Sequence, residues 1–220
     1  MAAPSPEEFP QRHIAVEGPI GVGKTSLVGL LAKRFSGTQI LEDVQNPFLS
    51  DFYAGKKGSA FQAQIYFLLS RYQQQLEIAQ IDLFRHLVVA DYTFSKDKLF
   101  ASLTLTDAEM SLYDRLYGPL SENVPRPDLV VHLTASVDTC LSRIRRRGRA
   151  YEKGITSTYL KSLIEAYNYF FYHYTAKPLL VIDTNEIDFV QRKDDLEDLV
   201  QQLVKPFRGT RIYVPRSAKR

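Results

Sequence analysis

The sequence predicts an α/β fold: a doubly wound, five-stranded parallel sheet with helices on both faces and an arginine-rich lid. Three observations predict it. A glycine-rich pattern occupies residues 18–25, short apolar runs alternate with helical patterns along most of the chain, and arginines cluster between residues 143 and 149. Strand–helix alternation is typical of parallel sheets that are covered by helices.

Composition fits one globular domain. The chain has 220 residues, of which 45% are hydrophobic and 24% are charged, enough apolar material for a core without a structural metal. Cys140 is the single cysteine, so no intrachain disulfide can form. No apolar run approaches the roughly 18 residues of a membrane helix. Residues 1–12 lack the pattern of a signal or transit peptide and are expected to be flexible. We therefore expect a cytoplasmic protein without a membrane partner.

Five apolar runs are predicted to be strands. They are short, rich in Val, Ile and Leu, and not alternating, as expected of parallel strands buried on both faces. The runs are His13–Glu17, Gln39–Glu42, Leu87–Ala90, Leu129–Leu133 and Leu179–Ile182.

Helical patterns separate these strands and follow the last one. The predicted helices are Lys24–Phe35, Ser59–Gln80, Thr106–Leu120, Ser136–Arg147, Thr156–Tyr174 and Asp194–Val204. The main domain is expected to span residues 13–207, with a lid at about 143–154. Residues 208–220 read as a basic tail that begins with a short extended segment, Arg211–Val214, and has a loose end.

The strongest motif is a phosphate-binding loop. Residues 18–25 match GxxxxGK[ST], with a predicted strand before them and a helix after them. Backbone N–H groups of such a loop surround phosphates, and the helix N-terminus adds partial positive charge. Lys24 is expected to reach the β- and γ-phosphates and Thr25 to ligate Mg²⁺. The predicted donor-binding residues of this segment are Gly18, Gly21, Val22, Gly23, Lys24, Thr25 and Ser26.

The loop alone does not identify the phosphate acceptor. GTPases, ATPase motors and small-molecule kinases all carry it. The chain lacks the Asn-Lys-x-Asp pattern that reads guanine in GTPases, and it is short for a motor.

Taken together, four blocks resemble the deoxynucleoside kinases, most closely the bacterial deoxyguanosine and deoxyadenosine kinase branch. The blocks are residues 18–25, 42–44, 90–97 and 143–149, and the resemblance runs from about Ile14 to Phe189. It implies a P-loop kinase fold, a homodimer, and ATP and a nucleoside as small-molecule partners. It also implies transfer of the γ-phosphate to the 5′-hydroxyl of a deoxynucleoside.

Two acids follow predicted strands on the acceptor side. Glu42 matches the general base of the family, because a nearby carboxylate can orient a 5′-hydroxyl and take its proton. Asp91 matches an acid on the Mg²⁺ side, although a strand-end acid also commonly caps a helix. Many family members carry an arginine directly after this acid, whereas this chain has Tyr92. Positive charge near the 5′-oxygen must therefore come from elsewhere.

Three polar residues match positions that contact the base: Gln64, Arg71 and Asp97. An arginine can donate to O6 and N7 of a purine, and an acid can accept from an exocyclic amine. Arg71 and Asp97 could equally form an ordinary structural ion pair. Tyr53 and Glu152 match residues that face the sugar 3′-hydroxyl.

The lid has a local net charge of +5, with six basic residues between Arg143 and Lys153 against Glu152 alone, while the whole chain has +3. The resemblance assigns Arg143, Arg147 and Arg149 to phosphates, with Arg143 and Arg147 in catalytic roles beside Lys24 and Glu42. A solvated helix end is the alternative. Asp188 and Phe189 match the loop that holds the adenine of ATP.

Other functions make different demands. A monophosphate kinase of the thymidylate type shares the loop, the acid and the lid, but needs extra positive charge for the acceptor phosphate. A noncatalytic nucleotide-binding regulator would not need five arginines in a lid. A nucleic-acid-binding module is not expected, because one short basic cluster in a chain of net charge +3 is a weak signal.

Overall fold

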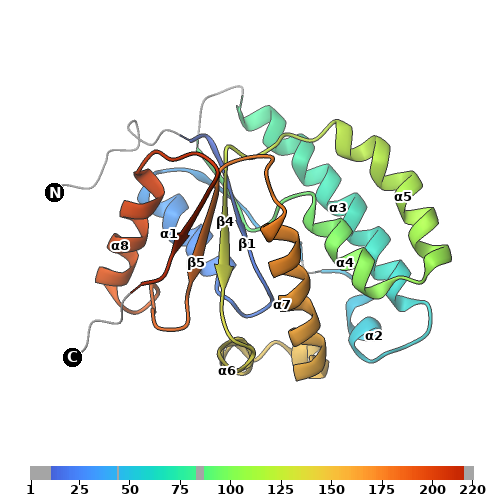
Figure 1. The fold of residues 1–220 in the computed structure, drawn as a ribbon. Coiled ribbons are helices and arrows are strands. Elements are labelled where there is room, and N and C mark those ends of the chain that lie inside the picture. The colour runs from blue at the N-terminus through green and yellow to red at the C-terminus, as the bar shows by residue number, and fades with distance from the viewer. Residues whose placement is uncertain (1–10, 44, 83–86, 216–220) are drawn as a thin grey trace.

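The computed structural model describes residues 11–43, 45–82 and 87–215. Its centre is a parallel sheet with the strand order β2-β3-β1-β4-β5-β6 (Figure 1). The described strands are β1 (His13–Glu17), β2 (Thr38–Ile40), β3 (Val88–Ala90), β4 (Leu129–Thr134), β5 (Leu179–Asp183) and β6 (Thr210–Tyr213).

The prediction of five strands is wrong by one. The first five lie where the sequence predicts them, with ends that differ by up to two residues. The sixth, β6, comes from the segment that reads as the start of a tail. It pairs with β5 in the register Leu179↔Thr210 and Ile182↔Tyr213. Its side chains are partly exposed, as expected of an edge strand. The loose-end prediction for the last residues and most of the flexible N-terminal segment fall outside the described residues.

Burial explains the apolar strand sequences. Every residue of β1 and β3 is buried, and so is every residue of β4 except the last, Thr134. Figure 1 shows α1 and α8 on one side of the sheet and α3, α4, α5 and α7 on the other. The helices are α1 (Lys24–Arg34), α2 (Leu49–Tyr53), α3 (Ser59–Asp82), α4 (Lys96–Thr104), α5 (Asp107–Glu122), α6 (Val137–Arg147), α7 (Ser157–Tyr172) and α8 (Lys193–Val204), with a 3-10 helix η2 at Ala150–Gly154.

A small second core fixes the helices that carry the acceptor-side residues. Leu68 of α3, Ala101 of α4 and Tyr113 of α5 pack together with Phe94. Thr106 begins α5 with a capping box, in which its hydroxyl accepts from the Glu109 backbone N–H while the Glu109 carboxylate accepts from Thr106. This packing holds α3 and α4 at fixed positions beside the sheet.

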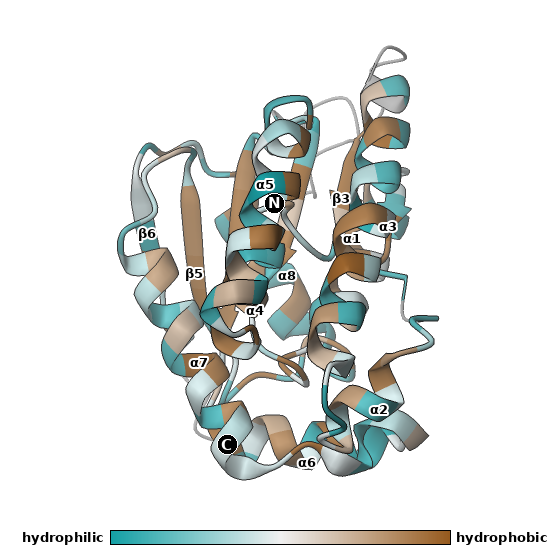
Figure 2. Ribbon diagram, turned by 90° about the vertical axis from the view of Figure 1, so that its right-hand side faces the viewer, coloured by the Kyte–Doolittle hydropathy of each residue, from teal (hydrophilic) through white to brown (hydrophobic). Residues whose placement is uncertain are grey.

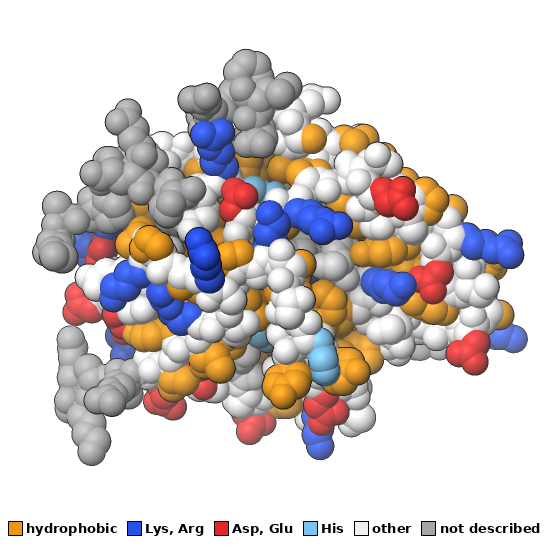
Figure 3. Space-filling model, turned by 45° about the horizontal axis from the view of Figure 1, so that its top comes forward, with side chains coloured by type: hydrophobic (Ala, Val, Ile, Leu, Met, Phe, Trp, Pro, Cys, Tyr) orange, Lys and Arg blue, Asp and Glu red, His pale blue; other side chains and the backbone are white. Residues whose placement is uncertain are grey.

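Several surface features are visible. Apolar bands recur along α3 and α5, which lie toward the viewer in Figure 2. On the face seen in Figure 3, Lys and Arg side chains lie scattered among hydrophobic and acidic ones. None of the helices in the described part of the chain is both long and apolar enough to cross a bilayer.

Candidate active site

The phosphate-binding loop connects β1 to α1 and needs its glycines. Gly18 has φ 141° and Gly21 has φ 85°. A Cβ atom would lie 2.4 Å from the carbonyl oxygen of Leu133 at Gly18 and 2.6 Å from that of Cys140 at Gly21. Side chains at these positions would therefore clash with backbone and force a strained conformation. The loop is a tight arc because β4 and α6 press against it.

Lys24 closes this arc. Its Nζ donates to the carbonyl oxygens of Gly18, at 2.8 Å, and Pro19, at 3.1 Å. Burial and the neighbouring charge of Lys96 lower the pKa of Lys24 to about 8. An anion bound at this loop would favour the charged form of Lys24 and so offset both effects, which fits a lysine that binds phosphates.

Asp91 joins the loop to the neighbouring strand ends. Its carboxylate accepts from the hydroxyl of Thr25, at 2.9 Å, and from the backbone N–H of Glu42, at 2.7 Å. A hydroxyl and a carboxylate beside a phosphate loop are the hard oxygen donors that Mg²⁺ uses together with phosphates and waters. Thr25 and Asp91 therefore fit the predicted metal role. The described residues contain no group of three or more His, Cys, Asp or Glu arranged to hold a metal by themselves.

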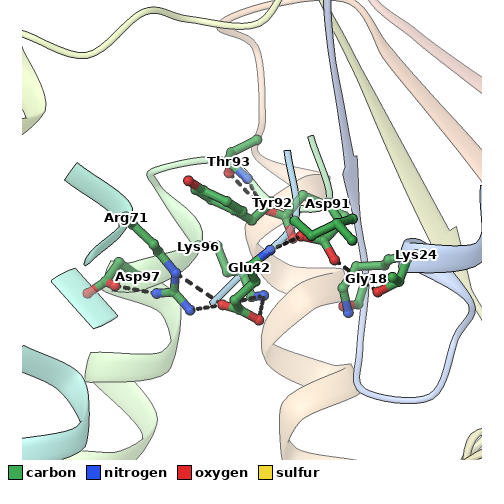
Figure 4. A network of polar contacts seen from close by, with 12 residues as sticks. Gly18, Lys24, Glu42, Arg71, Asp91, Tyr92, Thr93, Lys96 and Asp97 are labelled. Atoms are coloured by element: carbon green, nitrogen blue, oxygen red, sulfur yellow. Dashed lines mark hydrogen bonds and ion pairs between the residues drawn. The ribbon is translucent and has the colours of Figure 1, made fainter. Parts of the chain in front are cut away.

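The carboxylate of Glu42 lies between two cations (Figure 4). Lys96 donates to its two oxygens at 3.1 and 3.0 Å, and Arg71 donates through Nε at 3.1 Å and through a second nitrogen. Burial alone would raise the pKa of Glu42, but Lys96 and Arg71 outweigh it and hold that pKa well below its usual range. Glu42 is therefore ionised at neutral pH.

Asp97 lies behind Arg71 and not on the cavity wall. It pairs with Arg71 and accepts from the Gln64 amide at 2.6 Å and the Tyr113 hydroxyl at 2.7 Å. Its side chain is fully buried. The ion pair that the sequence left open as an alternative is thus present, while Gln64 and Arg71 reach the cavity surface.

One cavity, here called the acceptor cavity, gathers most predicted residues. It has a volume of about 240 Å³ and apolar walls from Phe67 of α3 and Phe100 of α4. The predicted residues that line it are Gly21, Lys24, Thr25, Glu42, Tyr53, Gln64, Arg71, Asp91, Arg147, Arg149 and Glu152.

The lid forms one wall of the acceptor cavity. Arg147 donates to Glu152 at 3.1 and 2.5 Å, and Arg149 donates to the Tyr151 hydroxyl at 2.9 Å. Glu152 itself is buried. Arg147 and Arg149 of the lid therefore line the cavity, and the buried acid Glu152 holds their side chains in place.

A second cavity, here called the donor cavity, lies on the other side of the loop. Its predicted lining residues are Gly21, Val22, Gly23, Ser26, Arg143, Arg147, Asp188 and Phe189. Arg143 donates to the carbonyl oxygens of Val22, at 3.0 Å, and Thr184, at 2.7 Å. It thereby ties the loop to the segment after β5. Gly18 does not line either cavity, and Arg149 lines only the acceptor cavity.

Sequence reasoning missed two basic residues that line these cavities and one buried acid that lies outside them. Arg146 lines the donor cavity, and Lys96 lines the acceptor cavity. Glu17, at the end of β1, accepts from the Thr93 backbone N–H at 2.6 Å and its hydroxyl at 2.9 Å, and it is 1% exposed. Burial raises the pKa of Glu17. The position of Glu17 directly before the glycine loop is a signal that could have found it.

The chain matches known proteins over nearly its full length. The family model described as deoxynucleoside kinase matches residues 14–207. The chain is 37% identical to deoxyguanosine kinase of Bacillus subtilis (84% of this chain, 92% of that protein). It is also 37% identical to deoxyadenosine kinase of Dictyostelium discoideum (90% and 80%). Among solved structures, deoxyadenosine kinase from M. mycoides with bound dATP is similar, with a TM-score of 0.74 and 26% identity, over 86% of this chain and 97% of that one.

Proposed function

This chain belongs to the deoxynucleoside kinase family, and on that premise we propose that it transfers the γ-phosphate of ATP to the 5′-hydroxyl of a purine deoxynucleoside. One observation carries the proposal. Glu42, Lys24 and the Thr25–Asp91 pair line the same cavity. A base for the hydroxyl and the groups that hold the phosphates thus share one cavity.

Each group has a separate task. Glu42 orients the 5′-hydroxyl and takes its proton. Lys24 and the loop hold the phosphates, and Arg147 brings lid charge to the phosphoryl group in transfer. Mg²⁺ held by Thr25 and Asp91 would neutralise phosphate charge when it binds with ATP.

Arg71 and Gln64 support a purine acceptor, since they present donors and an acceptor from one wall of the acceptor cavity. Tyr53 and Glu152, which line the same cavity, suit the sugar 3′-hydroxyl. We place deoxyguanosine slightly ahead of deoxyadenosine because of the Asp91-Tyr92 and Lys96 pattern. Of the two relatives that are 37% identical to this chain, one is named deoxyguanosine kinase and the other deoxyadenosine kinase.

A monophosphate kinase would need a further cation for the acceptor phosphate. Tyr92 supplies none: its hydroxyl donates to Gln74 at 2.7 Å, and its side chain does not line the acceptor cavity. The cations that do line this part of the cavity, Arg71 and Lys96, are already paired with Glu42. Nucleoside acceptors therefore fit these residues better than nucleotides do.

The test is ATP-dependent phosphorylation of four deoxynucleosides, four ribonucleosides and their monophosphates. We expect turnover with purine deoxynucleosides and none with monophosphates. Lys24→Ala should remain folded and almost inactive, because Lys24 acts on phosphates and not on the core. Glu42→Gln should lower kcat by roughly 10²–10⁴-fold with little effect on nucleoside affinity. Transfer to a monophosphate by the wild-type protein, or near-normal turnover by Lys24→Ala, would contradict the proposal.

A homodimer is also proposed. Leu69 and Leu76 of α3 and Leu112 and Leu116 of α5 are between 41% and 53% exposed. Each pair is spaced so that it shares one helix face, and the two helices pack against each other. Exposed leucines gathered in this way are typical of an association surface. We further place the enzyme in the cytoplasm, where the single buried thiol of Cys140 would stay reduced.

A further inference from the structure

Lys96 occupies a position where the charge of a lysine destabilises the fold unless it is compensated. It is 4% exposed, and a buried ammonium group costs free energy unless it has a partner. It also begins α4, where the helix dipole disfavours a cation. Neither packing nor helix stability therefore accounts for a lysine here.

The surroundings of Lys96 belong to the reaction site. Its Nζ contacts both oxygens of Glu42, lines the acceptor cavity, and lies 5.5 Å from the centre of the Phe100 ring. Within the described residues, Glu42 is the single carboxylate at ion-pair distance from Lys96. Arg71, by contrast, is held by two carboxylates, Glu42 and Asp97. Of the two cations on Glu42, Lys96 is thus the one whose partner can change.

We propose that Lys96 is a catalytic residue that supplies the positive charge at the acceptor 5′-oxygen and transfers its pairing from Glu42 to the phosphoryl group during the reaction. The inference rests on the proposed function. It assigns to Lys96 the charge that Tyr92 cannot provide.

The bonds that form and break in the proposed reaction determine how charge moves around Lys96. The 5′-oxygen forms a bond to the γ-phosphorus while the bond from that phosphorus to the bridging oxygen breaks, and its electron pair leaves with ADP. The proton of the 5′-hydroxyl passes to Glu42. Glu42 then becomes neutral and no longer compensates Lys96, while the oxygens around the γ-phosphorus are anionic and adjacent. An ammonium on a flexible stem can follow this shift of charge.

The test compares Lys96→Met, which keeps the length of the side chain, with Lys96→Arg, which keeps the charge. Lys98→Met is the matched control on the same helix, because Lys98 is half exposed and pairs with Asp114 at 2.9 Å. We expect Lys96→Met to lower kcat about 10²–10³-fold, the usual loss for one charge-stabilising donor. The Kd for deoxyguanosine, measured by calorimetry, should change little. Lys96→Arg should recover much of the loss, and Lys98→Met should behave as wild type.

Other results would overturn the assignment. Near-wild-type kcat in folded Lys96→Met would do so, and so would weaker deoxyguanosine binding and a lower Tm with normal turnover at saturation. If Lys96→Met does not fold, Lys96→Gln carries the same comparison. Absence of transfer by the wild-type protein to every nucleoside would refute the proposed function, and this inference with it. Transfer by wild type with unimpaired Lys96→Met would refute this inference alone.

Discussion

Asp97 contacts two residues of the acceptor cavity without lining the cavity itself. It accepts from Gln64 and Arg71, which line the acceptor cavity, and from Tyr113, which belongs to the small second core. In Asp97→Asn, an acceptor-only group becomes one that also donates, so Arg71 loses a carboxylate and Gln64 is free to turn. We expect an altered ranking of kcat/KM among deoxyguanosine, deoxyadenosine and deoxycytidine, with the KM for ATP nearly unchanged.

Tyr113→Phe separates this effect from simple stability. It removes one hydrogen bond to Asp97 but leaves the ion pair with Arg71, so it should cost about 1–2 kcal/mol of unfolding free energy and leave the ranking unchanged. If Asp97→Asn likewise lowers the Tm without changing the ranking, Asp97 is structural and has no part in base selection.

His132 gives the fold a dependence on pH. It is 2% exposed on β4, and its ring stacks on Phe171 with centroids 4.4 Å apart. Burial lowers the pKa of His132 to about 3, from an ordinary value of 6.5. The unfolded chain therefore binds a proton at this residue between those two pH values, and the folded protein does not. Stability from this group is complete above pH 6.5 and falls by about 1.4 kcal/mol per unit as the pH drops below it.

Urea unfolding between pH 4.5 and 7.5 measures this contribution. His132→Phe should flatten the decline of unfolding free energy on the acid side, whereas His173→Phe, at an exposed position, should not. Parallel curves for wild type and His132→Phe would show that other groups cause the acid sensitivity.

The residue types in the sequence predicted the chemistry of the site better than they predicted where its side chains lie. The GxxxxGK[ST] pattern identified Lys24 and Thr25. Neighbouring backbone lies so close to the loop that glycines are required at fixed positions, and this fixes the spacing of the pattern. The depth of Asp97 could not be read from the sequence, because a carboxylate in the first turn of a helix is usually solvated. Lys96 could not be assigned to the site from the sequence, because a lysine beside an aspartate resembles an ordinary surface pair. The role proposed for Lys96 depends on its contact with Glu42, which is distant in the sequence and close in the fold.

At the scale of elements, the contact between η2 and α2 brings the lid to the part of the acceptor cavity that Tyr53 lines. A Cβ added at Gly154 would lie 2.9 Å from the carbonyl oxygen of Tyr53 and 3.3 Å from its Cβ. Gly154→Ala should therefore push η2 away from α2 and displace Tyr53 and Glu152. We expect the KM for the deoxynucleoside to rise about tenfold, within the usual 1–3 kcal/mol cost of overpacking.

Gly118→Ala is the control for this substitution. Gly118 lies in α5 with open space around its would-be Cβ, so alanine should leave KM unchanged and stabilise the helix by about 0.5–1 kcal/mol. An unchanged nucleoside KM in Gly154→Ala would mean that the lid does not need this close approach.

The elements that the sequence predicted well are long or fully buried. Helices with a clear period, such as α1 and α8, were placed to within one residue, and the first five strands to within two. The short helices α2 and α4 were missed, since five and nine residues give too little periodicity and depend on tertiary packing. Strand β6 was recognised as extended, but its pairing with β5 depends on contacts that no local pattern encodes.

At the scale of the whole molecule, the proposed dimer makes a prediction about mass in solution. Leu112→Glu places a charge on the exposed α5 face and should shift the protein from dimer to monomer in light scattering. Ile212→Glu, on β6 and also strongly exposed (72%), should leave the mass unchanged. If Ile212→Glu is the variant that dissociates the protein, association occurs through the sheet edge and not through α3 and α5.

The position of β1 has a consequence for synthesis. This strand is made first, yet it lies in the interior of the sheet, where His13 pairs with Val88 and Ile14 with Leu129. On the ribosome the backbone of this apolar strand therefore has no hydrogen-bonding partner strand until β3 and β4 have emerged, and the sheet is complete only when β6 is released. Strand pairings between segments so distant in sequence form slowly, and hydrophobic segments stay exposed until they form. The arrangement that holds the phosphate loop between two neighbouring strands thus delays the burial of the strand that leads into the loop.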